Sequence, residues 1–214
     1  MIKRIIALLS IFVIFLAAGC GNSESTNASQ ETTAPSFPGE PYKLTTLPGT
    51  LYITDSYHVY ATNSGYTEQM CAAQGIEKSK VDMYLPLSGY DMLIFPKNEP
   101  FANPNFKINV RAKNDKDYGI QNLKDQSDEE ISAMANTLVS GFASTGSVSE
   151  PTIYKSSTAT YIVFDWFPAG LSSQRRYATI INGTMVYFIG ETPADSFTQE
   201  QDAQIREIVD TLTY

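Results

Sequence analysis

The strongest constraint on the fold lies in the second half of the chain, where two predicted strands are apolar on both faces. In Tyr161–Phe167 and in Met185–Ile189, apolar side chains fill successive positions, with Asp165 as the exception. Successive side chains of a strand point to opposite faces of a sheet. An antiparallel sheet with one face in water shows a cleaner alternation of apolar and polar residues. We therefore expect a sheet that is covered on both faces.

Two predicted helices can supply that cover, and each begins with a capping box. Ser127 stands three residues before Glu130, and Thr198 stands three residues before Gln201. Apolar residues then recur at helical spacing: Ile131, Met134, Leu138 and Phe142 in the first helix, and Ile205, Ile208, Val209 and Leu212 in the second. The sequence thus predicts the α+β class, as an α/β/α sandwich with a mostly antiparallel central sheet.

The remaining elements are predicted from local signals. Strands are expected at Leu51–Thr54, Tyr57–Tyr60, Tyr90–Phe95, Phe106–Ala112, Glu150–Lys155, Ala159–Phe167, Arg175–Ile181 and Thr184–Gly190. Asn182-Gly183 favours a type I′ hairpin turn, because both residues tolerate positive φ. Thr67–Gly75 is a short helical candidate, and Val81–Leu87 is ambiguous, with a helical turn as one reading.

The order of these elements resembles the PsbP-like fold. The segments that carry the resemblance are Leu47–Ile53, Leu123–Phe142, Tyr177–Gly183 and Ile208–Leu212, and together they cover most of Tyr42–Tyr214. That family includes an extrinsic subunit of photosystem II and bacterial lipoproteins. The resemblance implies an accessory or binding protein rather than an enzyme, and it supplies no catalytic residue.

The first twenty residues have the features of a bacterial lipoprotein signal. Two basic residues precede the apolar run Ile5–Ala18, which as a helix would span about 21 Å and is short for a membrane core of about 30 Å. The run ends at Leu16-Ala17-Ala18-Gly19-Cys20, which resembles a lipobox with Ala17 at the usual leucine position. We expect lipidation of the Cys20 thiol. A plain secretory signal and an uncleaved anchor are the alternatives.

The sequence predicts three parts: a signal peptide over residues 1–19, a lipidated N-terminus with a disordered polar tether over 20–41, and a single PsbP-like domain over 42–214. The expected location is the extracytoplasmic face of the cell membrane, where the lipid holds the chain to the membrane. The formal net charge of −8 argues against a nucleic-acid partner.

Residues that could carry chemistry are few. His58 is the only histidine, and we expect it at a sheet edge; Cys71 is expected to be buried in the short helix. Asn114–Gly119 is similar to the first half of a calcium loop, but Gln126 stands where the bidentate glutamate would be needed. We therefore predict no catalytic residue, no metal site and no cofactor.

Three residues are candidates for binding. Phe101 lies in a loop with three prolines, Pro96–Asn105, and such long loops often carry binding residues. Arg175 and Arg176 could contact an anion, although neighbouring strand residues point to opposite faces, so one surface can use only one of them. The alternatives are that Phe101 fills the core and that both arginines are ordinary solvent-facing charges.

The predicted function is that of a membrane-anchored, surface-exposed lipoprotein with a non-catalytic binding or accessory role, with an envelope protein as a possible partner. Two alternatives stay open. One is a cell-envelope hydrolase that uses two carboxylates converging in a cleft. The other is the ligand-binding lipoprotein of a transport system, although such proteins usually have two lobes, for which about 173 residues are few.

Overall fold

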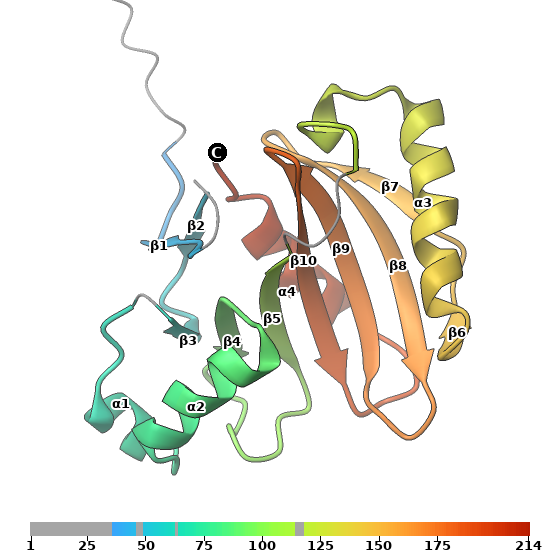
Figure 1. Ribbon diagram of the computed structural model, residues 1–214. Helices are drawn as coiled ribbons and strands as arrows, with labels where there is room; N and C mark the ends of the chain where they lie inside the picture. The colour runs from blue at the N-terminus through green and yellow to red at the C-terminus, as the bar shows by residue number, and fades with distance from the viewer. Residues whose placement is uncertain (1–35, 46–48, 63, 114–117) are drawn as a thin grey trace, which may run out of the picture. The chain divides into compact units, whose positions relative to one another are not determined.

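The computed structural model describes residues 36–45, 49–62, 64–113 and 118–214. The chain divides into two units, Met1–Ser36 and Phe37–Tyr214. The predicted signal peptide, Cys20 and most of the predicted tether lie outside the described residues, so these remain predictions. The second unit holds all the helices and strands of the described residues (Figure 1).

One large sheet forms the centre of this unit, and all its paired strands run antiparallel. The strand order is β3-β4-β5-β10-β9-β8-β6, and β7 also pairs with β8. The bounds are β3 Tyr57–Ala61, β4 Met92–Pro96, β5 Lys107–Lys113, β6 Gly146–Val148, β7 Thr152–Lys155, β8 Thr160–Pro168, β9 Ser173–Ile181 and β10 Thr184–Thr192. A separate two-stranded sheet pairs β1, Glu40–Lys43, with β2, Thr50–Ile53.

Helices cover both faces of the large sheet. They are α1 Glu68–Ala73, α2 Lys78–Ser88, α3 Asp128–Phe142 and α4 Gln199–Val209, with a short 3₁₀ turn at Leu123–Asp125. Helix α4 packs on β10 and β2, while α3 packs on β6, β7 and β8. In Figure 1, α2 and α3 lie on the near side of the sheet and α4 lies behind it.

Strand β10 shows how the two faces are filled. Val186 and Phe188 belong to the core cluster that includes the apolar residues of α4. The alternate residues Met185, Tyr187 and Ile189 belong to the cluster beneath α3. A third cluster joins α1 and α2 to β3 and β4. The prediction of a mostly antiparallel sheet between helical layers, in the α+β class, is confirmed.

The local signals at the chain's turns and caps are confirmed as well. The Ser127 hydroxyl accepts from the Glu130 backbone N–H at 3.3 Å, and the Glu130 carboxylate accepts from the Ser127 N–H at 2.9 Å. Thr198 and Gln201 form the same reciprocal pair at α4. Asn182 and Gly183, between β9 and β10, have φ angles of 47° and 78°.

The N-terminal boundary requires a correction. Strand β1 includes Glu40 and Pro41, which were predicted to belong to the disordered tether over 20–41. Their pairing with β2 explains the difference, since Pro41 lies opposite Tyr52 and the Phe37 ring lies 5.7 Å from that of Tyr52. A proline needs no ladder N–H on an edge strand, so its presence did not prevent pairing.

Two further elements differ from expectation. Strand β6 was not predicted, because three residues of Gly-Ser-Val carry no strand pattern of their own and depend on pairing with β8. The ambiguous segment around Val81–Leu87 is a full helix, α2, which contains Pro86 and ends at Gly89 with φ 65°. Burial of Val81 and Leu85 holds this helix on the sheet.

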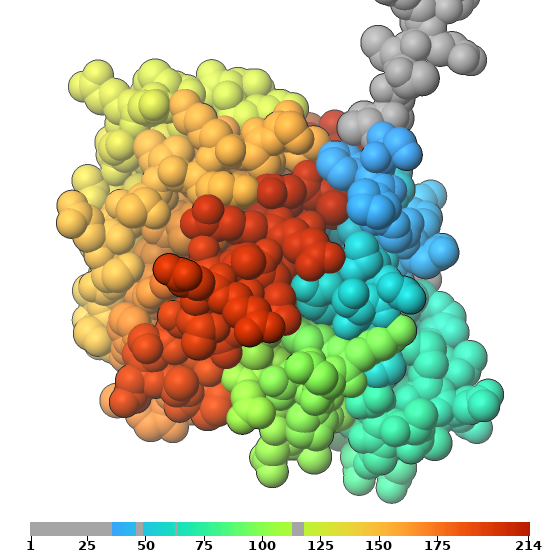
Figure 2. All heavy atoms as spheres, turned by 180° about the vertical axis from the view of Figure 1, so that it is seen from behind, coloured from blue at the N-terminus to red at the C-terminus, as the bar shows by residue number. Residues whose placement is uncertain are grey.

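Figure 2 shows the opposite side of the molecule, where the C-terminal segment in red meets the strands β1 and β2 in blue and cyan. Thr50 and Thr213 exchange both backbone hydrogen bonds, each at 2.9 Å. Leu212 is fully buried beside them. The end of the chain is thereby joined to the beginning of the domain.

Candidate binding surface

The described residues contain no helix that is long and apolar enough to cross a membrane. Within the same residues, no group of three histidine, cysteine or acidic side chains is arranged to hold a metal ion. Two hollows lined by described residues have volumes of about 450 and 500 Å³.

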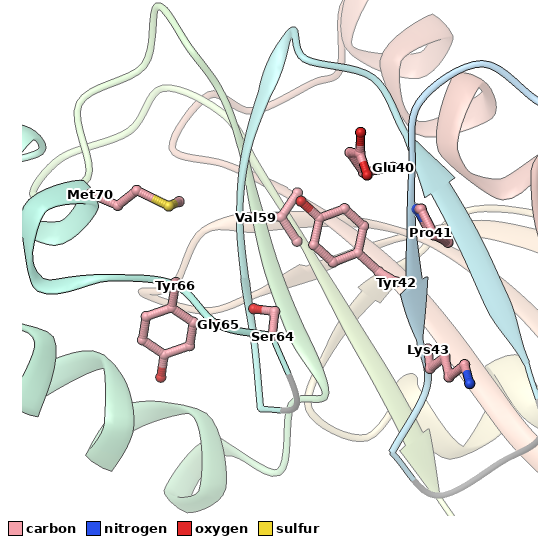
Figure 3. A pocket seen from close by; sticks show the side chains of 9 residues that line it. All are labelled: Glu40, Pro41, Tyr42, Lys43, Val59, Ser64, Gly65, Tyr66 and Met70. Carbon is pink, nitrogen blue, oxygen red and sulfur yellow. The ribbon is translucent and has the colours of Figure 1, made fainter.

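The first hollow has a volume of about 450 Å³ and lies between β1, β3 and the start of α1. Figure 3 shows Met70 and Tyr42 approaching from opposite sides, with Val59 between them, while the Tyr66 ring points away. Glu40 and Lys43 add charges of both signs. This mixed lining selects no particular kind of ligand.

The second hollow, which we call the α2 hollow, has a volume of about 500 Å³. It lies between α2, β4 and the loop that joins β4 to β5. Its lining is apolar or aromatic at nine positions and basic at two: Ile76, Met83, Tyr84, Leu87, Leu93, Phe95, Phe101, Ala102 and Pro104, with Lys80 and Lys107. Such a lining, apolar with few polar groups, is typical of ligand sites.

Helix α2 contributes unusually exposed apolar side chains to this hollow. Met83 is 60% exposed, Tyr84 40% and Leu87 78%. Among the described residues, Leu171 is the fourth large apolar side chain with high exposure, and it does not line the hollow. Clustered apolar exposure, unlike scattered exposure, marks interaction sites. The α2 hollow therefore has the character of a binding surface.

Phe101, a candidate from the sequence, forms part of this hollow. Its ring centroid lies 4.8 Å from that of Phe95 and 5.4 Å from that of Tyr60. The loop is held by the Glu99 carboxylate, which accepts from the Asn105 backbone N–H at 2.7 Å. One side of Phe101 thus packs on buried aromatic rings, as expected for a core residue. The residue also lines the hollow, as expected for a binding residue.

Met83, Tyr84 and Leu87 were not predicted from the sequence as binding residues. A signal was present, because α2 carries apolar residues on its buried side at Val81 and Leu85 and again on the side away from the core. A helix with apolar residues around most of its circumference is usually packed against other groups on more than one side. That signal could be interpreted only after the segment was known to be a helix.

The charges at the α2 hollow are basic. Lys80 Nζ lies 3.6 Å from Glu77 Oε1, and Lys107 Nζ lies 2.9 Å from Glu191 Oε2. Neither glutamate lines the hollow, and no other acidic side chain does. The hollow is thus an apolar surface whose two charged lining groups are lysines, each paired with a glutamate outside the lining.

Arg175 lies on the α4 side of the sheet and is bound by two carboxylates. Its Nε and Nη2 donate to both oxygens of Asp165 at 2.7 and 2.8 Å, and its Nη1 donates to Asp202 at 3.0 Å. The Asp165 hydrogen bonds raise the pKa of Arg175 above its ordinary value. Arg175 is therefore committed to a structural ion-pair network.

Arg176 lies on the opposite face, as predicted for neighbouring strand residues. It is 9% exposed, and its guanidinium carbon lies 4.5 Å from the Phe142 ring and 5.0 Å from the Trp166 ring. Burial lowers the pKa of Arg176 to about 10. Neither arginine is an ordinary solvent-facing charge, so that alternative is wrong. Arg175 pairs with Asp165 and Asp202, and the rings of Phe142 and Trp166 pack against Arg176.

Three carboxylates, those of Glu150, Asp165 and Asp202, line one hollow of about 230 Å³ with Arg175, and the two aspartates are the ones that contact this arginine. Both accept hydrogen bonds from that guanidinium. Asp202 also accepts from the Tyr177 hydroxyl at 2.7 Å and pairs with Arg206 at 2.9 Å. With these oxygens occupied, the geometry favours a structural role over general acid and base catalysis.

His58 and Cys71 lie where the sequence placed them. His58 is on the edge strand β3, and its Nε2 accepts from Gln74 Nε2 at 2.8 Å. Burial lowers the pKa of His58, and the positive charge of Lys97 lowers it further. Cys71 is fully buried in α1, and burial raises the pKa of its thiol. Most of the calcium-like segment, residues 114–117, lies outside the described residues.

Comparison with known proteins identifies a structural neighbour. No protein-family model matches the chain, and no curated protein matches its sequence. Among solved structures, the chain is similar to the solution structure of cyanobacterial PsbP (CyanoP) from Synechocystis sp. PCC 6803. The identity is 9%, the match covers 82% of this chain and 92% of that one, and the TM-score is 0.43. A likeness at that score carries no argument about function.

Proposed function

We propose that this chain is a lipoprotein held by Cys20 at the extracytoplasmic face of the cell membrane. Its folded domain is a non-catalytic binding or accessory module that binds a component of the cell envelope at the α2 hollow. The observation that carries the binding role is the exposure of Met83, Tyr84 and Leu87 beside the buried side chains of Leu93 and Phe95.

The anchor rests on the sequence. A short basic and apolar leader ends in small residues and Cys20, followed by a polar segment. A thiol is required, because the lipid is attached through sulfur. At about 0.8 kcal/mol for each buried CH₂, two or more acyl chains are needed for stable anchoring.

The anchor is tested with palmitate labelling and membrane fractionation of the full chain. Cys20→Ser is expected to abolish labelling and to leave unprocessed or released protein. Cys71→Ser, which removes the other cysteine, is expected to keep both labelling and membrane association. Unchanged labelling of Cys20→Ser would refute the anchor.

The binding surface is tested by crosslinking the anchored protein in its own membranes, followed by affinity capture. We expect Leu87→Ser to lose the material that the wild type enriches over a lipid-anchored control domain. Leu171→Ser is the matched control, because it removes an equally exposed leucine, 71% exposed against 78%, outside the hollow. Equal capture by both variants would refute the α2 hollow as the binding surface.

A further inference from the structure

The lining of the α2 hollow indicates the class of ligand, on the premise that this hollow is the binding surface. Its volume of about 500 Å³ falls within the range of small-molecule sites, which is about 300–1,000 Å³. A stable protein interface needs about 800 Å² from each partner. Clustered apolar exposure is confined here to three side chains of one helix, which favours a small ligand.

The walls of the hollow suit an alkyl chain. Leu93 and Phe95 are buried beneath it, and Phe101 is fixed at one side by its contacts with aromatic rings. Met83 and Leu87 stand on the α2 side with much of their surface in water. An apolar ligand would remove this surface from water, which favours binding.

The two charged groups of the lining suit an anion. Both are lysines, although the chain carries a formal net charge of −8. Each ammonium has three N–H donors and is paired with one carboxylate, Lys80 with Glu77 and Lys107 with Glu191. Donors therefore remain for an acidic group, and the Lys107 side chain, 22% exposed, is partly withdrawn from water, where such a contact is stronger.

We propose that the α2 hollow binds a free anionic amphiphile, a single alkyl chain that ends in a carboxylate. The chain lies against Phe101 and the exposed apolar side chains of α2, and the carboxylate lies between Lys80 and Lys107.

The experiment uses the full lipidated chain in nanodiscs of phosphatidylcholine. The probe is dodecanoate with a diazirine in its chain, and the crosslinked peptides are identified by mass spectrometry. We expect labelling at residues 76–88 and 101–107, with competition by unlabelled dodecanoate and at least fivefold weaker competition by dodecanol. Empty nanodiscs correct for probe that dissolves in the lipid.

Two pairs of variants give the charge and the apolar contacts separate readouts. The double change Lys80→Gln and Lys107→Gln is expected to lower labelling about five- to tenfold. Lys155→Gln is the control, because Lys155 also pairs with one acid, Asp128, and is 56% exposed. Leu87→Ser is expected to lower labelling about tenfold, whereas Leu171→Ser leaves it unchanged. Unchanged urea midpoints show that each variant is folded.

Four outcomes would overturn the proposal. Equal competition by dodecanol would show that no anion is recognised. Equal labelling of α2 by a diazirine phospholipid would identify the bilayer surface as the occupant. Capture of a protein that depends on Leu87, without dodecanoate labelling, would leave the proposed binding function in place and remove this ligand class. If neither capture nor labelling responds to Leu87→Ser, the α2 hollow itself is wrong.

Discussion

Helices α2 and α4 are both eleven residues long, yet they differ in how many of their apolar side chains are buried. In α4, Ile205, Ile208 and Val209 are all buried. In α2, two apolar residues are buried while Met83, Tyr84 and Leu87 are exposed. The apolar content of α4 matches the core that it covers, whereas α2 has more apolar surface than the domain uses. This excess is the reason for assigning binding to α2.

Helix α4 also has more polar contacts with the sheet than α2 has. Three tyrosine hydroxyls of the sheet donate to carboxylates along α4 and its cap: Tyr177 to Asp202 at 2.7 Å, Tyr57 to Glu207 at 2.9 Å and Tyr154 to Asp210 at 2.8 Å. In α2, Asp82 accepts from Tyr66 at 2.6 Å and pairs with Lys78. Helix α4 is thus tied to the sheet along its length.

The largest predicted effect comes from truncating one apolar residue in each helix. Ile208→Ala removes a side chain that is 1% exposed, and we expect the unfolding free energy to fall by about 3 kcal/mol. Leu87→Ala is expected to change it by less than about 0.5 kcal/mol. Urea denaturation followed by the fluorescence of Trp166 measures both. Similar losses in the two variants would remove the contrast between the helices.

The next effect concerns the ion-pair network of α4. Asp202→Ala removes the carboxylate that binds Arg175 and Tyr177 through Oδ1 and Arg206 through Oδ2, and we expect the unfolding free energy to fall by about 2 kcal/mol. Asp195→Ala changes an exposed acid outside the network and is the control, with a loss below about 0.5 kcal/mol. If both variants have the same urea midpoint, the network is not what fixes α4.

A smaller effect is expected at the end of α2. Gly89 has φ 65°, and a Cβ there would meet only ordinary contacts, the nearest being Arg111 Nε at 3.7 Å. Gly89→Ala should therefore cost about 1 kcal/mol from backbone strain alone. Gly141→Ala, in open space within α3, should instead stabilise the protein by up to about 1 kcal/mol. Thermal unfolding of both variants checks the opposite signs.

The smallest effect is a pH dependence at His58, whose ring holds the end of α1 through Gln74. The folded protein has a pKa for His58 below the ordinary 6.5. Between the folded and unfolded pKa values the unfolded chain binds more protons, so the unfolding free energy falls as the pH decreases through 6.5. Urea midpoints between pH 7 and pH 5 should fall less for His58→Gln than for the wild type. An equal fall would exclude this contribution.

Elements with local signals could be predicted from the sequence. The capping boxes at Ser127 and Thr198 and the turn at Asn182-Gly183 specify their own backbone. Strand β6 and helix α2 could not be identified, because pairing with β8 and burial of Val81 and Leu85 decide them. These contacts join residues that are distant in the chain.

The candidate site was predictable only in part. Phe101 could be selected because three prolines mark its loop. The exposure of Met83 and Leu87 depends on which side of α2 meets the sheet, and that depends on tertiary packing. The burial of Arg176 depends on Phe142 and Trp166, which no local pattern connects to it.

The backbone pair between Thr50 and Thr213 has a consequence for the order of events during synthesis. The two residues are 163 positions apart, and one lies in β2 while the other is the penultimate residue of the chain. The packing of β2 therefore depends on a residue that is made 163 positions later. A chain that is synthesised from its N-terminus can therefore complete this part of the fold only after Thr213 has been made, so the pairing of β1 with β2 alone does not complete the packing of these strands.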